Sequence, residues 1–231
     1  MAQPRVAVII PTLNEASCIA DTLRRVHALP GPIECIVADG HSHDQTRTYA
    51  SPYATVCISP RGRGRQMNRG AAQTTAPLLL FLHADTTVTP AAWRAMHDAL
   101  QRPAVQAGTF RLAFDHTTPL LRFYAWCTRL NWWGFAFGDR GLFIRRTHFE
   151  AIGGFAPIPI FEDLNMARRL CAQGGFQFVD APVVTSARRF RAVGTLRQQM
   201  QNAWLWLRYM TGTPPTEMAN AYAYNSSVRG S

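Results

Sequence analysis

The sequence contains no lysine: all 24 of its basic residues are arginine. This absence excludes enzymes that use a Schiff-base lysine, P-loop nucleotide hydrolases and Ser-Lys hydrolases. With 14 acidic residues, the formal net charge at neutral pH is +10. A guanidinium group can hold a phosphate or a carboxylate through two parallel hydrogen bonds. The charge therefore favours nucleotide phosphates, nucleic acid or an anionic membrane surface as partners.

Paired cysteines and long apolar runs are also missing. The five cysteines are odd in number and none has CxxC spacing, which argues against a disulfide framework or a zinc site. They fit a reducing compartment. The N-terminus lacks a basic segment followed by a long apolar one, and no run approaches the ~20 apolar residues of a membrane span. We therefore expect a cytoplasmic protein, with contact at the inner face of the membrane as an option.

Short β-branched runs alternate with amphipathic stretches in the first half of the chain. The strands expected lie at 5–10, 33–38, 54–58 and 77–82. Helices are expected between and after them, at 14–29, 43–50, 64–75 and 90–100. Strands that alternate with helices at this spacing favour an α/β fold, with a mostly parallel sheet covered by helices on both faces.

The second half of the chain is less regular. Its expected strands are 105–114, which must turn or bulge near Gly108, then 141–145, 176–179 and 183–185. Its expected helices are 119–133, 161–173 and a long final helix at 194–210. The tail after Pro214-Pro215 is expected to be mobile. The chain shows no break in composition, so one domain of 231 residues is expected.

Polar residues follow three of the expected strands. Pro11 and Thr12 end the first strand, Asp39 ends the second and Asp85 follows the fourth. In parallel sheets, ligands bind beyond the carboxyl ends of the strands, so these positions favour a ligand site. The alternative at each position is a residue that merely caps the next helix.

Four separated motifs carry a resemblance to a known family. They are VIIPTLNE at 8–15, IVADGHSHDQT at 36–46, LFLHAD at 80–85, and IFEDL at 160–164 after GDRGLF at 138–143. In this order and spacing they resemble the family 2 glycosyltransferases with the GT-A fold, over roughly residues 5–190. The segment GRGRQMN at 62–68 is most similar to a compact single-domain branch associated with arsenosugar biosynthesis.

The resemblance divides the single domain, 1–231, into three parts. It implies a nucleotide-binding half at about 5–115, an acceptor and catalytic half at about 116–190, and a C-terminal helix with a mobile tail at about 191–231. The donor would be a UDP- or GDP-sugar, and the sequence does not identify the acceptor. Binding of nucleic acid is not expected for such an enzyme.

The resemblance also implies a nucleotide site. Pro11, Thr12 and Glu15 would line its pocket, and Asp39 would accept hydrogen bonds from the base. The residues His83, Ala84 and Asp85 match the family's metal motif, in which His83 replaces the first acid.

Asp85 would hold Mg²⁺ or Mn²⁺ against the donor diphosphate, since both ions prefer oxygen ligands. His83 would hydrogen-bond the ribose, and a packed or solvated histidine is the alternative. Arg63 and Arg65, in the glycine-rich segment before a helix, are expected to contact the nucleotide or its diphosphate, and a solvated charged loop is the alternative.

Asp163 is the implied catalytic base of an inverting transfer, with Glu162 beside it. From local sequence alone, both acids equally suit the start of a helix. The pair Asp139-Arg140 would face the acceptor or form an intrachain ion pair. The pair Arg188-Arg189 lies where related enzymes close over the diphosphate.

Two other classes of protein remain as alternatives. Gly40-His41-Ser42-His43-Asp44 follows a strand like the nucleophile elbow of a serine hydrolase, but Asp44 replaces the final glycine of that motif. The positive charge also permits a nucleic-acid-binding domain, although no motif of that class is present. The aromatic stretches at 123–135 and 204–209 favour a packed core, with an apolar acceptor or a bilayer as alternatives.

Overall fold

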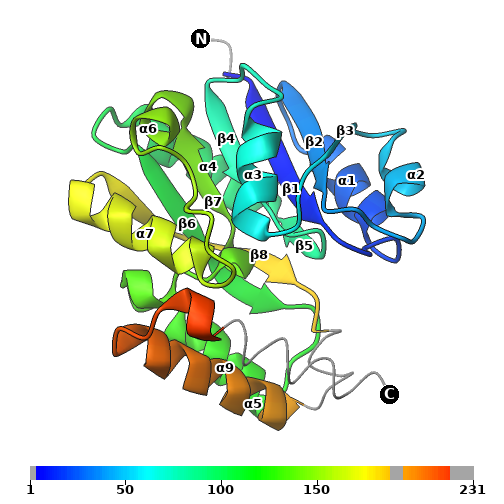
Figure 1. The fold of residues 1–231 in the computed structure, drawn as a ribbon. Helices are drawn as coiled ribbons and strands as arrows, with labels where there is room; N and C mark the ends of the chain where they lie inside the picture. Colours follow the sequence, from blue (N-terminus) through cyan, green and yellow to red (C-terminus); the bar gives the residue numbers. More distant parts are fainter. Residues whose placement is uncertain (1–3, 188–194, 219–231) are drawn as a thin grey trace.

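Eight strands form one mixed sheet, in the order β3-β2-β1-β4-β7-β6-β8-β5 (Figure 1). The structure is a computed structural model that describes residues 4–187 and 195–218, with the side chains of the last helix described from residue 203 onward. Its first half is the expected parallel unit. The strands are β1 (Val6–Thr12), β2 (Ile33–Asp39), β3 (Thr55–Ile58) and β4 (Leu78–Phe81). The helices between them are α1 (Ile19–His27), α2 (Thr46–Ala50) and α3 (Arg63–Ala71).

The second half extends the sheet with strands of both directions. In chain order it contains β5 (Thr86–Val88), α4 (Pro90–Gln101), β6 (Ala107–Phe114), α5 (Pro119–Cys127), two 3-10 turns η1 (Trp133–Phe135) and η2 (Gly138–Arg140), β7 (Leu142–Arg145), α6 (Arg146–Ala151), α7 (Glu162–Gln173), β8 (Phe176–Thr185) and α9 (Thr195–Met210). β7 runs antiparallel to β4 and β6, and β8 runs parallel to β6.

Several element boundaries differ from the sequence prediction for identifiable reasons. The two strands expected at 176–179 and 183–185 are one strand, β8, which pairs with β6 at both of its ends, through residues 176–178 and 182–185. The expected bulge falls between Thr109 and Arg111, where the register of that pairing shifts. The helix expected at 119–133 ends at Cys127, and η1 follows as a separate turn. The first helix begins at Ile19 instead of residue 14, since Asn14 has a positive φ of 56°.

The sheet separates two hydrophobic layers. Alternate residues of β1 point to opposite faces, so Val8 packs with α1 and α4 while Ile9 packs with α3, α6 and α7. α3 lies very close to the sheet: a Cβ at Gly70 would be 2.5 Å from Cγ2 of Ile9. α9 lies against α5 below the sheet in Figure 1. No helix in the described part of the chain is both long and apolar enough to cross a membrane.

Candidate active site

Asp39 organises the carboxyl ends of β1 and β2. Its carboxylate is fully buried and accepts hydrogen bonds from Thr12 Oγ1 at 3.0 Å, from Ser42 N at 2.8 Å and from Ser42 Oγ at 2.5 Å. Arg47 Nε lies 3.9 Å from the same carboxylate. A carboxylate has about four lone-pair sites, so these three bonds leave about one for a ligand. Direct contact between Asp39 and a base therefore stays a prediction, whereas its structural contacts are clear.

The same contacts bear on the hydrolase alternative. A hydrolase nucleophile needs a histidine base and an open position. Ser42 is 2% exposed, and its hydroxyl donates to Asp39 and accepts from the amide of Asn14 at 2.9 Å. This geometry assigns Ser42 to the packing of the loop.

Gln66, which the sequence motifs did not single out, links the carboxyl ends of β1 and β2. Gln66, on the buried side of α3, donates from Nε2 to the carbonyl oxygens of Thr12 and Ala38, each at 2.8 Å. It packs closely against Gly40, where a Cβ would lie 3.1 Å from the Gln66 amide. Little in the sequence indicates this role, because Gln66 lies in an arginine-rich segment whose arginines suggest the ligand contact.

The loops after β1 and β2 are joined by a second set of contacts. The amide of Glu15 donates to Thr46 Oγ1 at 2.8 Å, and the amide of Ala16 donates to Asp44 Oδ2 at 3.1 Å. The side chain of Asn14 accepts from the amide of His43 at 2.9 Å. Glu15 is buried, as are Pro11 and Thr12. The first two motifs, residues 8–15 and 36–46, are therefore joined into one wall at the carboxyl ends of β1 and β2.

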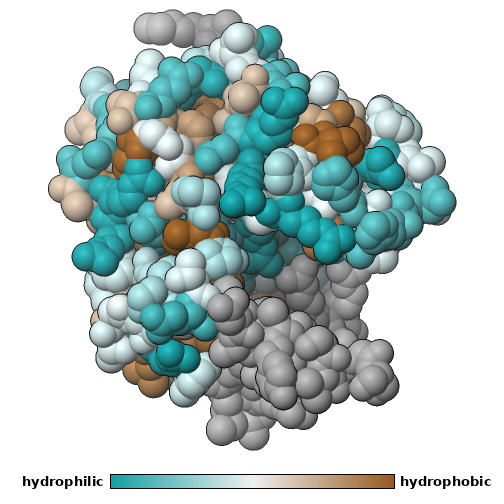
Figure 2. Space-filling view, viewed as in Figure 1, coloured by the Kyte–Doolittle hydropathy of each residue, from teal (hydrophilic) through white to brown (hydrophobic). Residues whose placement is uncertain are grey.

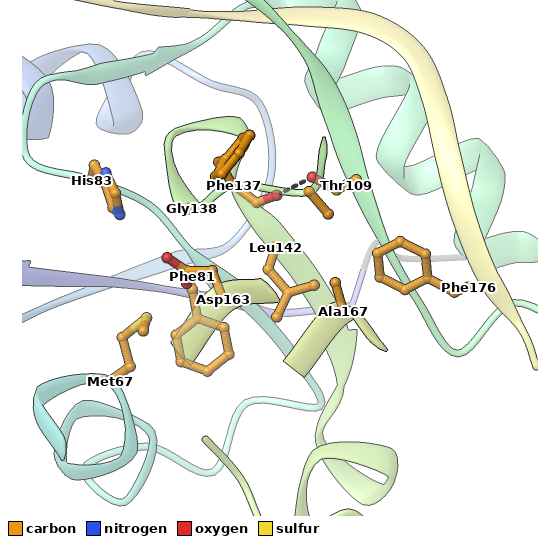
Figure 3. A pocket seen from close by; sticks show the side chains of 12 residues that line it. Met67, Phe81, His83, Thr109, Phe137, Gly138, Leu142, Asp163, Ala167 and Phe176 are labelled. Atoms are coloured by element: carbon orange, nitrogen blue, oxygen red, sulfur yellow. Dashed lines mark hydrogen bonds between the residues drawn. The ribbon is translucent and has the colours of Figure 1, made fainter. Parts of the chain in front are cut away.

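A pocket beyond the end of β4 brings His83 and Asp163 together (Figure 3). Gly138 of η2 lies between them: a Cβ there would be 2.1 Å from Asp163 Oδ2 and 2.7 Å from His83 Nε2. Figure 3 shows the Asp163 carboxylate pointing toward the end of the pocket where His83 and Gly138 lie. The rest of the lining is largely apolar and includes Met67 and Phe81. A side chain at position 138 would fill this space, so the glycine is required by close approach.

The acids at this end of the sheet raise one another's proton affinity. Burial, followed by the charge of Asp85, raises the pKa of Asp139 to about 6. Burial and the neighbouring Glu162 raise the pKa of Asp163 well above its usual value. Arg63 acts in the opposite direction and lowers the pKa of Asp139, Glu162 and Asp163. Carboxyl groups with raised pKa values in a cleft are typical of acid–base sites.

Arg63 begins α3 and faces Glu162 at the start of α7. Its Nη1 atom lies 4.0 Å from Oε1 of the buried Glu162, while Arg63 itself is about half exposed. The start of α3 is closely packed, since a Cβ at Gly64 would be 2.7 Å from the carbonyl oxygen of Ala156 and 3.5 Å from Cβ of Glu162. Arg65 is exposed on the same first turn. The glycine-rich segment thus places one arginine against the acids and a second one toward solvent.

Of the other predicted site residues, two are buried in the protein and two lie outside the residues that the structure describes. Arg140 is fully buried, and it donates to the carbonyl oxygens of Phe110 at 2.6 Å and Phe135 at 2.9 Å. Its guanidinium also lies over the ring of Phe178, 5.5 Å from the centroid, and interacts with the charge of Asp139. Ala84 is buried in the core beside α1. Arg188 and Arg189 lie outside the described residues.

The residues present supply part of a metal site. Within the described residues, no three His, Cys, Asp or Glu side chains are grouped closely enough to hold an ion by themselves. Asp85 is half-buried at the edge of the sheet, and its charge acts on Asp139. A single carboxylate with a second one nearby fits a divalent ion that takes its remaining ligands from phosphate oxygens and water, as Mg²⁺ commonly does.

The fold and this site define a class of protein. The sheet order and covering helices match solved GT-A glycosyltransferases. A mannosyltransferase from Pyrobaculum calidifontis, solved with GDP-Man and Mn²⁺, is 24% identical with a TM-score of 0.60, covering 80% of this chain and 57% of that one. The glucosyl-3-phosphoglycerate synthase of Mycobacterium tuberculosis, solved with Mn²⁺ and UDP, is 18% identical with a TM-score of 0.65, covering 91% and 81%. At these identities the likeness shows the fold alone.

The chain belongs to glycosyl transferase family 2, whose model matches residues 7–159. Curated relatives from Mycobacterium tuberculosis and Mycobacterium bovis, described as PGL/p-HBAD biosynthesis glycosyltransferases, are 31% identical over 162 residues. That match covers 66% of this chain and 59% of each relative, so the chain spans about three fifths of their length. The family match includes Asp39, Asp85 and Asp139 but ends before Glu162 and Asp163.

Proposed function

We propose that the protein transfers a sugar from a nucleoside-diphosphate donor to an acceptor hydroxyl, with inversion at the anomeric carbon. The observation that carries the proposal is the approach of Asp163 to His83 around Gly138, next to the carboxylates of Asp85 and Asp139. This group of acids lies beyond the end of β4, where parallel sheets bind their ligands. Membership of family 2 supports the reaction class.

Asp163 is the proposed base. Its carboxylate takes the proton of the acceptor hydroxyl while the acceptor oxygen forms a bond to the anomeric carbon. The bond from that carbon to the diphosphate breaks, and the nucleoside diphosphate leaves with the electron pair. The raised pKa of Asp163 makes the carboxylate a stronger base than an exposed aspartate. The neighbouring Glu162 is buried, lies 4.0 Å from Arg63 and shares in the titration of the pair.

The donor would lie along the wall formed by the first two motifs. Asp39, Thr12 and Glu15 order that wall for the nucleoside, and Arg63 and Arg65 would contact the diphosphate from the start of α3. Asp85 would hold Mg²⁺ or Mn²⁺ together with the phosphate oxygens. The bound ion supplies charge neutralisation for the departing diphosphate. The fold neighbours solved with GDP-Man or UDP support a nucleotide-sugar donor of this kind.

Donor binding is tested by calorimetry with UDP and GDP in the presence of Mn²⁺, and again after chelation with EDTA. We expect binding that EDTA weakens and that Asp85→Ala largely removes. Asp98→Ala, which removes an exposed acid on α4, is the matched control and should bind as the wild type does. Absence of nucleoside-diphosphate binding in the presence of Mn²⁺ would refute the proposed function.

The base assignment is tested with Asp163→Asn. This variant should bind the nucleotide normally and transfer sugar about 10²–10⁴ times more slowly, the usual contribution of a general base. Transfer must be measured as glycosylated product, because water can bypass the base when the donor is hydrolysed. Glu162→Gln is the comparison and should lose less activity. Wild-type turnover in Asp163→Asn would remove Asp163 from this role.

The acceptor and any membrane contact belong to the proposal as well. The curated relatives are described as PGL/p-HBAD biosynthesis glycosyltransferases, and that description is theirs alone. For this chain we propose an acceptor with a free hydroxyl that reaches Asp163, and a peripheral contact with a membrane surface.

A further inference from the structure

Exposed apolar side chains gather on two neighbouring helices, α5 with its continuation to Leu130, and α9. Five of the nine large apolar residues exposed in the described structure belong to this set. We call them the α5–α9 face: Phe123 (61% exposed), Trp126 (52%), Leu130 (46%), Trp204 (50%) and Leu207 (55%). Side chains of this size are normally covered when they cluster, so the set marks a surface that meets something apolar.

Helical spacing places the members of each helix on one side. Phe123, Trp126 and Leu130 follow i, i+3 and i+7 spacing, and hydrogen bonds within the turn after Cys127 carry the helical path to Leu130. The rings of Phe123 and Trp126 are stacked, with centroids 6.1 Å apart. Trp204 and Leu207 occupy the outward side of α9, opposite the buried Leu205. Both helices therefore carry large apolar residues on the solvent side as well as on the side that packs against the protein.

The remaining aromatic residues of these segments have a different use. Trp206 stacks on Phe135 with centroids 5.8 Å apart and donates from Nε1 to the carbonyl oxygen of Gly134 at 2.8 Å. Tyr209 contacts Phe161, next to the proposed catalytic acids. These contacts fix the inner side of α9 to the protein. The outward residues are thus additional to what the packing of α9 requires.

Arginines without nearby acids surround the face. Arg122 and Arg129 are exposed beside Trp126, and in the described part of the chain no acidic side chain lies within salt-bridge distance of either one. Arg208 lies over the ring of Trp204, 4.9 Å from its centroid. The described segments 119–130 and 203–210, which carry the face, contain Arg122, Arg129 and Arg208 and no aspartate or glutamate. The chemistry of the face is therefore apolar and cationic together.

We propose that the α5–α9 face docks the protein on an anionic lipid bilayer. Exposed Trp and Phe insert at the boundary between headgroups and acyl chains, and neighbouring arginines attract anionic lipids. A second copy of the chain is a poorer partner, since a two-fold contact would place the same uncompensated arginines against each other. Nucleic acid would use the arginines and the aromatic rings, but it offers no apolar phase for Leu130 and Leu207.

The test uses the full chain and two kinds of vesicle, one of phosphatidylcholine alone and one that also contains phosphatidylglycerol. We expect cosedimentation with the anionic vesicles, weakening as salt is added. Trp126→Ser with Trp204→Ser should lower the partition coefficient about ten-fold or more. Arg122→Gln with Arg129→Gln should lower it roughly 30-fold, which corresponds to about 1 kcal/mol for each arginine.

Two matched controls distinguish the contribution of this surface from the effect of the protein's total charge and from the effect of any exposed aromatic ring. Arg94→Gln with Arg102→Gln removes the same two charges from exposed positions at α4 and its end. Tyr49→Ser removes an exposed ring of α2. Both controls should partition as the wild type does. Equal losses in the controls and in the α5–α9 variants would overturn the proposal.

Other occupants of the face give distinct results. Failure to bind anionic vesicles, together with a dimer in analytical ultracentrifugation that Trp126→Ser dissociates, would assign the face to a second copy and overturn the proposal. Binding of a single-stranded oligonucleotide that the arginine variants abolish, without vesicle binding, would overturn it as well. Nucleotide binding measured by calorimetry should be unchanged in all these variants, so the result is independent of the proposed activity.

Discussion

Among the described residues, Arg63 is the cation that acts on three acids of the proposed site, and its removal should move their pKa values. Replacement by glutamine removes the positive charge whose presence lowers the pKa of Asp139, Glu162 and Asp163. We therefore expect every one of these pKa values to rise in Arg63→Gln. Since the base must be deprotonated to act, the pH at which transfer becomes fast should rise with the pKa of Asp163.

The size of the change follows from the geometry. At the 4.0 Å that separates Arg63 Nη1 from Glu162 Oε1, a pair of unit charges interacts by about 4 kcal/mol at an effective dielectric of 20 and by about 1 kcal/mol in water. Arg63 is about half exposed, which favours the lower part of this range. A change of roughly 1–2 kcal/mol corresponds to about one pKa unit.

The assay is a carbon NMR titration of the carboxyl groups in protein labelled at aspartate and glutamate, performed in EDTA, so that Glu162 is observed together with Asp163. It needs no acceptor, and Asp163→Asn assigns the Asp163 signal. Arg63→Lys is the control: it keeps the charge, so the Asp163 titration should stay close to that of the wild type. If Arg63→Gln left the titration of Asp163 unchanged, the electrostatic account of this site would be wrong.

Three further outcomes are expected. Gly138→Ala should abolish transfer, because a Cβ 2.1 Å from Asp163 Oδ2 must displace that carboxylate, and calorimetry should still find nucleotide binding. Asp139→Asn in EDTA should raise the free energy of unfolding by up to about 3 kcal/mol at pH 7.5. Folding raises the pKa of Asp139 to about 6, so this gain in stability should fade as the pH falls toward about 3.9, the pKa of an unfolded aspartate. Urea titrations that found the same gain at about pH 7.5 and near pH 4 would contradict this account. Gln66→Leu should lower stability by about 1–2 kcal/mol, since two buried carbonyl oxygens lose a donor.

The strand-end residues were predictable because local pattern defines them. Thr12 and Asp39 end buried β-branched strands, and parallel pairing brings the ends of β1 and β2 into register, Thr12 opposite Asp39. The position of Asp85 follows from the same rule. Four agreeing motifs then predicted the family and the fold. This part of the architecture depends on interactions that recur along each segment, and the sequence displays those interactions directly.

The meeting of Gly138 with Asp163 and His83 was not predictable, because it depends on how three distant segments pack. The same limit applies to Arg140, whose place beside Asp139 suggested an ion pair or an acceptor contact. Its guanidinium also donates to two backbone carbonyl groups inside the protein, and those bonds depend on the packing of distant segments. Gln66 shows a third case, since its two acceptors belong to strands that precede it by more than 25 residues.

The amide of Ser186 donates to the carbonyl oxygen of Asp85 at 3.1 Å, directly after β8 pairs with β5. Two residues about a hundred positions apart in the chain thus share one hydrogen bond, and Thr86 and Thr185 share the next one, at 3.1 Å. The proton of the Ser186 amide is protected only while β5 and β8 remain paired. The rate at which this amide exchanges with deuterium would therefore report how often the β5–β8 edge beside Asp85 opens in the protein without substrate.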